Sequence, residues 1–257
     1  MAGGSGYRAP SVKRALKILE LVAESGQGLG ISQLARRLEI SKGTVFGLCS
    51  QLEAGGALCR DPQTKRYGLG PLVATLAGRG FVHTRLRDAA GPELTRLRDR
   101  LGESVFLGVM TRSEIIVVDS RQPAGVVGIS AGAGTRLPLT AGAVGKVLLA
   151  GLPPAEVERI LSQGLKAYTP RSITDPESFR RQLEQVRRQG YALERDEYLT
   201  GVWGAAVPLG VQGGMPVALW AVGFTSALAP GRLEEIAERL VRARERILPA
   251  LAPEPGG

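Results

Sequence analysis

The sequence is poor in the residues that build disulfide frameworks and zinc sites, with two cysteines and one histidine among 257 residues. Cys49, Cys59 and His83 cannot supply four ligands of these types. We therefore expect reduced cysteines, with Cys49 in a core, and neither a metal nor a cofactor. No run of about 18 apolar residues is present, and the start MAGGSGYRAP lacks the apolar centre of a signal peptide. These absences favour a cytoplasmic protein without a membrane span.

Positive charge is in excess, with a net charge of +9. Residues 1–80 contain 11 Lys and Arg against 5 Asp and Glu, whereas residues 81–257 contain 22 against 19. A basic N-terminal region would attract nucleic-acid phosphates, but a basic soluble surface would show the same count. Charge alone does not distinguish the two.

The stretch from Ile31 to Leu52 predicts two helices joined by a tight turn. Apolar residues recur with helical spacing at Ile31, Leu34, Ala35 and Leu38, and then at Val45, Leu48, Cys49 and Leu52. Ser41 is placed to cap the second helix by accepting from a first-turn N–H. That helix begins with the small and polar residues that a helix-turn-helix protein inserts into the major groove.

Further elements complete a winged helix-turn-helix over residues 11–70. A helix starting at Ser11 is predicted to pack on the pair through a face made of Val12, Ala15, Leu16, Leu19 and Val22, with Ile18 beside them. After the pair, residues 57–60 and 66–69 flank a turn at 61–65 and predict a hairpin. This wing would offer Lys65 and Arg66 to phosphates or the minor groove. A hairpin that only closes a small domain is the alternative.

The remainder predicts linker helices at 71–101, with a domain boundary at 78–85, and an α+β sensor domain at 102–252. The expected strands are 104–110, 114–120, 125–130, 191–195, 203–210 and 216–224, and the expected helices are 143–152, 155–165, 177–189 and 232–251. Their irregular alternation favours α+β over a doubly wound parallel sheet. Residues 1–10 are expected to be a disordered tail, and 253–257 a second tail.

Two glycine-rich motifs resemble catalytic ones. Gly128–Gly132 matches G-x-S-x-G, but a hydrolase needs a histidine after the serine, and His83 precedes it. Gly142–Lys146 resembles the end of a phosphate loop, yet Val147 stands where Ser or Thr would hold magnesium. The second motif remains a helix entry whose N–H groups could meet a polar ligand, or a site of tight helix-to-sheet packing.

Three carboxylates lie at the end of the strand predicted at 191–195. They are Glu194, Asp196 and Glu197, with Arg195 among them. The sequence spacing indicates no second pair of carboxylates that could share acid–base work with them. A solvated loop is therefore favoured over catalysis, with one carboxylate lining a ligand pocket as the alternative.

Taken together, several segments resemble the IclR (isocitrate lyase regulator) family of transcription regulators over essentially the full chain. These are SVKRALKILE, the helix-turn-helix, RDPQTKRYGLG, LPLTAGAVGKVLLAGLP, SITDPESFRRQLEQVRRQGYALERDE and GVWGAAVPL. The resemblance implies an N-terminal winged helix, a dimerising linker helix and a C-terminal α+β domain of the GAF or PAS type. That domain would bind a small molecule and shift the affinity for DNA.

The resemblance also places an effector pocket. By position it would be lined by Val126, Ile129, Leu137, Ala143, Val144, Glu194, Gly204, Ala221 and Gly223. Gly204 stands where the family often has cysteine, Thr140 where it often has histidine, and Ala221 and Gly223 where it often has hydroxyl side chains. A less polar pocket predicts a ligand larger or more apolar than a small keto acid, such as an aromatic one, near Trp203 or Trp220.

The predicted reading helix departs from the family at Gly47, where an arginine usually follows the aromatic residue. Glycine removes that contact and weakens the helix by about 1 kcal/mol. Base reading would then rest on Ser41, Lys42, Thr44 and Gln51, with Arg14, Lys65 and Arg66 on the DNA backbone.

These inferences predict a ligand-responsive DNA-binding regulator, not an enzyme, that binds a palindromic double-stranded operator as a homodimer or a dimer of dimers. One alternative is a sensor or interaction protein with weakened DNA binding, for which Gly47 is the main support. The other is an enzyme, a small-molecule hydrolase, with structural N-terminal helices.

Overall fold

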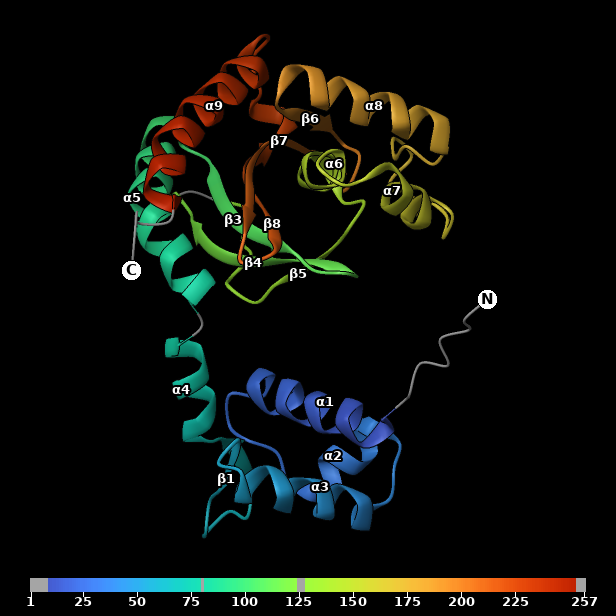
Figure 1. Cartoon of the computed structure of the whole chain (residues 1–257), viewed down its shortest axis with the longest axis vertical. Coiled ribbons are helices and arrows are strands. Elements are labelled where there is room, and N and C mark those ends of the chain that lie inside the picture. Colours follow the sequence, from blue (N-terminus) through green and yellow to red (C-terminus); the bar gives the residue numbers. More distant parts are fainter. Residues whose placement is uncertain (1–8, 80, 124–127, 253–257) are drawn as a thin grey trace. The chain divides into compact units, whose positions relative to one another are not determined.

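The computed structural model describes residues 9–79, 81–123 and 128–252. Within these ranges the chain divides between Phe81 and Val82 into two compact units, which are described separately below (Figure 1).

The first unit is a winged helix-turn-helix, as predicted. Its elements are α1 (Pro10–Glu24), α2 (Ile31–Leu38), α3 (Lys42–Ala54), β1 (Leu58–Arg60), β2 (Tyr67–Leu69) and α4 (Pro71–Arg79). Strands β1 and β2 pair antiparallel as the wing. Cys49 is buried in the core, where desolvation raises the pKa of its thiol to about 11, and Cys59 is exposed; neither forms a disulfide.

The helix boundaries follow the sequence, but the buried face of α1 does so only in part. Ile18 and Val22 are buried as predicted, together with Leu21, whereas Val12 and Leu16 are each 57% exposed. The prediction was wrong for Val12 and Leu16 because apolar residues occupy two adjoining strips of this helix, and packing against α2 and α3 selects only one. At α3 the Ser41 hydroxyl accepts from Thr44 N at 3.1 Å, which confirms the predicted cap.

Gly70 ends the wing where two backbone segments approach closely. A Cβ at this position would lie 2.2 Å from the carbonyl oxygen of Gly56 and 2.8 Å from that of Leu58. Because backbone atoms cannot yield as a flexible side chain does, we expect Gly70→Ala to destabilise the first unit by about 2 kcal/mol or more in denaturant unfolding. The control is Gly47→Ala, whose Cβ meets nothing within 4 Å and should stabilise α3 by up to about 1 kcal/mol. Equal stability of the two variants would contradict this expectation.

The second unit is an α+β domain built on one antiparallel sheet. Its strands are β3 (Ser104–Met110), β4 (Glu114–Arg121), β5 (Arg136–Pro138), β6 (Ala192–Arg195), β7 (Val202–Gln212) and β8 (Met215–Phe224). In the described residues the sheet order is β5-β4-β3-β8-β7-β6. The strand predicted at 125–130 is not formed: 124–127 lie outside the described residues, 128–130 are irregular, and β5 pairs with β4 instead.

Helices cover both faces of this sheet (Figure 1). One face packs on α5 (Phe81–Leu101) and α9 (Arg232–Leu251), and the other on α6 (Gly142–Ala150), α7 (Pro154–Leu161) and α8 (Pro176–Gln189). Along β3, Val105 and Leu107 contact the α5 side while Phe106 contacts the α6 side. This alternation leaves the central strands buried on both faces, so nearly all their residues are apolar.

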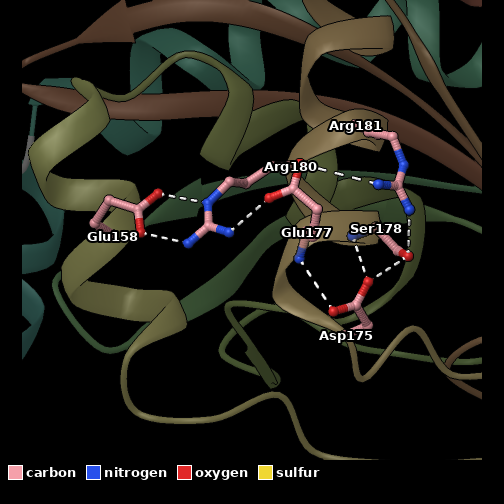
Figure 2. A network of polar contacts seen from close by, with 6 residues as sticks. All are labelled: Glu158, Asp175, Glu177, Ser178, Arg180 and Arg181. Carbon is pink, nitrogen blue, oxygen red and sulfur yellow. Dashed lines mark hydrogen bonds and ion pairs between the residues drawn. The ribbon is translucent and has the colours of Figure 1, made fainter.

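A polar network joins α7 to α8 (Figure 2). Asp175 caps α8 by accepting from Ser178 N at 2.8 Å, and the Ser178 hydroxyl and backbone hydrogen bonds hold the pKa of Asp175 below its usual range. Arg180 donates to both carboxylate oxygens of Glu158 on α7, at 2.8 and 2.6 Å, and also to Glu177. Because these pairs are exposed they add little stability, and α8 is held mainly by its buried residues Phe179, Leu183 and Val186.

Candidate functional site

The outward face of α3 centres on two residues without side chains, Gly43 and Gly47. Successive helix residues are rotated by about 100°, so Thr44 and Gln51 lie on one side of a line through Gly43 and Gly47, and Phe46 lies on the other side. Phe46 is 52% exposed, unusual for an aromatic side chain. The arrangement lets the α3 backbone approach another surface closely, with small polar groups on one flank and a ring on the other. Phe46 was not among the predicted DNA-reading residues, although its offset from the core positions Val45 and Cys49 already placed it outside.

The predicted DNA-contacting residues all belong to the first unit, and most are exposed. Exposed side chains extend from α1, α3 and the wing: Arg14, Lys42, Thr44, Gln51 and Lys65. Ser41 is also exposed, although its hydroxyl is engaged in the cap. Arg66 is half-buried and donates to the Gly28 carbonyl oxygen at 3.4 Å, so it also ties the wing to the loop before α2.

The wing turn has a fixed geometry that presents its basic residues. The Asp61 carboxylate accepts from the backbone N–H of Gln63 at 2.8 Å and of Thr64 at 2.7 Å, and these bonds lower the pKa of Asp61. Lys65 adopts a left-handed backbone conformation with φ of 58° and projects from the turn. Arg60 stacks over the Tyr67 ring at 5.6 Å. The hairpin is therefore rigid and positively charged.

The second unit encloses a cavity of about 210 Å³ on the α6 side of the sheet. It is lined by Phe106, Ile129, Ser130, Ala131, Thr135, Leu137, Ala141, Gly142, Ala143, Val144, Glu194, Tyr198, Leu199, Val202, Gly204, Trp220 and Val222. The lining is largely apolar, and the N-terminal end of α6 opens into it. A mostly apolar cavity with a few convergent polar groups is typical of a small-molecule site.

Most of the residues predicted for the effector pocket line this cavity. They are Ile129, Leu137, Ala143, Val144, Glu194 and Gly204, while Val126 lies outside the described residues. Ala221 and Gly223 do not: Ala221 packs in the α5–α9 core, and a Cβ on Gly223 would meet Trp203. The predicted positions on β8 were wrong by one residue. Neighbouring residues of a strand point to opposite faces of the sheet, so Ala221 and Gly223 point away from the cavity.

The true cavity residues of β8 are Trp220 and Val222. Trp220 stacks on Phe106 with ring centroids 5.4 Å apart, forming an aromatic wall. Of the two tryptophans proposed to lie near the ligand, Trp220 does, whereas Trp203 is buried on the opposite face.

Glu194 is the acidic group of the cavity lining. It is 6% exposed, and its Oε2 accepts from Glu197 N at 2.9 Å. Burial raises the pKa of Glu194 to about 7, against the opposing effects of that hydrogen bond and of Lys146. The sequence favoured a solvated loop here, which is wrong for Glu194, and the alternative of one carboxylate lining a pocket is the arrangement found.

Lys146 explains why the phosphate-loop resemblance does not hold. Its side chain is 1% exposed and turns away from the α6 N-terminus, with Nζ 2.7 Å from Glu197 Oε1 and 3.3 Å from the Leu193 carbonyl oxygen. The pair holds the loop after β6 against α6. The glycine-rich entry to α6 lines the cavity through Gly142, Ala143 and Val144, and Lys146 is not part of the lining.

The loop after β6 forms part of the cavity wall. Tyr198 and Leu199 line the cavity, and Tyr198 makes an edge contact with Tyr168 at 5.0 Å. The Ser172 hydroxyl donates to the Glu197 carbonyl oxygen at 2.7 Å, which fixes this loop to the segment before α8. The sequence spacing did not predict that Tyr168 and Tyr198 lie together, because they belong to two loops that are distant in sequence and meet only in the fold.

The arrangement offers little for hydrolysis. Ser130 lines the cavity, but its hydroxyl is paired with the Gln122 amide at 2.8 Å, and residues 128–132 do not form the strand-to-helix turn of a nucleophile elbow. In the described part of the chain no group of three metal-ligating side chains is found. No described helix has the length and apolar character needed to cross a membrane.

A winged helix-turn-helix with a rigid basic hairpin, followed by an α+β domain that encloses a small apolar cavity, defines a transcription regulator with a ligand-binding domain. Family models agree. The model for the IclR helix-turn-helix domain matches residues 11–62, and the model for the bacterial transcriptional regulator IclR C-terminal region matches residues 80–247. The chain belongs to the IclR family, as its sequence motifs predicted, and is an IclR-type regulator with a DNA-binding and a ligand-binding domain.

Individual relatives cover nearly the whole chain. It is 30% identical to the regulator BhcR of Paracoccus denitrificans, over 96% of this chain and 88% of BhcR, and 30% identical to the repressor AllR of Klebsiella pneumoniae, over 96% and 92%. An IclR regulator of Alicyclobacillus acidocaldarius matches with a TM-score of 0.80 and 29% identity, over 96% of this chain and 100% of that one. An IclR homologue of Microbacterium hydrocarbonoxydans complexed with 4-hydroxybenzoate also has a TM-score of 0.80, at 28% identity over 94% and 98%.

Proposed function

We propose that the chain is a cytoplasmic repressor, and not an enzyme, that binds a palindromic operator as a homodimer or dimer of dimers. The observation that supports it is the exposed α3 face of Gly43, Thr44, Gly47 and Gln51 beside a basic wing. AllR, a relative over nearly the full length, is named a repressor. An effector that binds one arrangement of the sensor domain more tightly would change the spacing of the two winged helices and so their fit to the operator.

We further propose that the effector is an aromatic carboxylic acid. Its ring would lie along the Phe106–Trp220 wall, and its carboxylate at the N-terminus of α6, where first-turn N–H groups such as that of Ala143 lack helical partners. The 4-hydroxybenzoate complex of the Microbacterium relative supports this chemistry.

Calorimetry tests the effector class directly. Titration of the full chain with 4-hydroxybenzoate should show saturable binding that is at least about tenfold tighter than binding of succinate, because only the aromatic acid covers the apolar walls. Tight binding of small dicarboxylates alone would contradict the proposal.

Operator binding is expected to depend on Lys42, the basic residue at the start of α3. Lys42 is the first residue of α3 and is exposed, so it can reach a phosphate or a base edge. We expect Lys42→Ala to weaken operator binding by about tenfold or more in a gel shift and to reduce its salt dependence by about one phosphate contact. The matched control, Arg188→Ala on α8, removes the same charge far along the chain and should leave affinity unchanged. An unchanged Lys42→Ala affinity would refute this placement.

The alternative is a sensor that has lost DNA binding, and Gly47 is the observation that favours it, since no side chain extends from the centre of the α3 face. The two functions are separated by a gel shift with the DNA upstream of the protein's own gene. A salt-dependent, sequence-selective shift by the wild-type chain supports the regulator. A shift without sequence selectivity would favour the sensor.

A further inference from the structure

A second concave site lies on the opposite side of the α+β domain from the effector cavity, between α5 and α9. Five arginines and Leu97 line a hollow of about 50 Å³, namely Arg96, Arg100, Arg239, Arg242 and Arg246. The two helices lie side by side on one face of the sheet (Figure 1). Arg96 and Arg100 are one turn apart on α5, and the other three recur at i, i+3 and i+7 on α9, so each helix directs one stripe toward the hollow.

Carboxylates behind the hollow hold several of these guanidinium groups in place. Glu93, whose side chain is 5% exposed, pairs with Arg96 and, across the two helices, with Arg246 at 2.9 Å. Glu235 accepts two hydrogen bonds from Arg239, and Glu238 lies 3.7 Å from Arg242. A guanidinium has five N–H donors, and these contacts use only one or two on each, so donors remain for a ligand.

The charges in this region do not balance. Five guanidinium groups face three carboxylates, and within the described ranges Arg100 has no ion-pair partner. The lining itself contains no carboxylate among the described residues. Like charges gathered around one hollow repel, and a bound anion would relieve that repulsion. Glu235 is also shared with Arg232, so positive charge remains uncompensated, and a phosphate group with its charge of about −2 would offset it.

We propose that this arginine hollow binds the phosphate group of a small phosphorylated metabolite, as a second ligand site separate from the effector cavity. A hollow of this size has room for a few waters or for one tetrahedral oxyanion. Guanidinium groups bind phosphate oxygens with paired N–H donors. Because arginines from two helices line the same small hollow, the geometry suits an isolated phosphate better than the successive phosphates of a DNA strand.

The test is calorimetry of the full chain with inorganic phosphate as the probe, at physiological salt. The double variant Arg100→Gln/Arg242→Gln removes the unpaired guanidinium and the most weakly paired one, and it leaves Glu93 and its two partners intact. The control, Arg112→Gln/Arg188→Gln, removes the same charge from exposed positions outside the hollow. We expect saturable binding by the wild type and the control, and at least a tenfold loss in the double variant.

Absence of saturable binding by the wild type, or equal binding by both double variants, would overturn the proposal. So would a double variant that loses affinity for non-specific duplex DNA while retaining phosphate binding, since these arginines would then bind DNA. Titration with 4-hydroxybenzoate should be the same for all three proteins, which separates this site from the proposed effector function.

Discussion

Gly204→Leu is expected to yield a regulator that binds its operator but no longer responds to effector. Gly204 lies on β7 opposite Glu194 of β6 and Val222 of β8. A Cβ at this position already lies 3.2 Å from Glu194 Cγ and Oε1 and 3.6 Å from the Ala143 Cβ. A leucine side chain must therefore extend into the cavity of about 210 Å³ and displace the Glu194 carboxyl. We expect effector affinity to fall by about 100-fold or more, equivalent to about 2.7 kcal/mol.

The matched control is Gly151→Leu at the other end of α6. Gly151 is exposed with a right-handed helical backbone, and its Cβ would meet only the Leu148 carbonyl oxygen at ordinary van der Waals distance. This variant should bind effector normally. Calorimetry measures effector binding, and a gel shift with and without effector measures the response. Wild-type affinity in Gly204→Leu would show that the ligand lies elsewhere.

Strand β8 shows how far the sequence predicts the site and where it stops. A run of apolar residues locates the strand. Both faces of this central strand are covered, so nearly every residue is apolar and the pattern does not indicate which face is which. The family resemblance supplied positions one residue away from the correct ones. Only the pairing of β8 with β3 and β7 shows that Trp220 and Val222 face the cavity.

In helix α1, as in β8, the apolar pattern locates the element but does not show which of its faces is buried. Helical spacing predicts the element, yet two adjoining apolar strips leave the buried face open, and the contact with α2 and α3 decides it. In contrast, Ser41 and Asp175 act within four residues of the sequence, and caps of this local kind could be predicted without the fold. The burial of Glu194 required the fold, because its neighbours Lys146 and Gly204 are distant in sequence.

Glu194→Gln is expected to change how stability depends on pH. Burial raises the pKa of Glu194 to about 7 from a model-compound value of 4.5, so between these pH values the folded state binds more protons than the unfolded state. The contribution of Glu194 to the free energy of unfolding of the wild type must therefore fall as pH rises through that interval, by at most about 3 kcal/mol. Glutamine cannot ionise. Relative to the wild type, Glu194→Gln should gain stability between pH 5 and pH 8, as measured by denaturant unfolding at both pH values.

The matched control is Glu184→Gln on α8, which removes an exposed carboxylate and should keep the wild-type pH profile. The same ionisation governs effector binding if the ligand is a carboxylate. The Glu194 Oε1 atom lies only 3.1 Å from where a Cβ on Gly142 would stand, at the start of α6, so an anion bound there would repel ionised Glu194. Wild-type affinity for 4-hydroxybenzoate should thus decrease up to tenfold per pH unit above about 7, and Glu194→Gln should bind it independently of pH. Parallel profiles for the two proteins would show that Glu194 does not exchange a proton when the ligand binds.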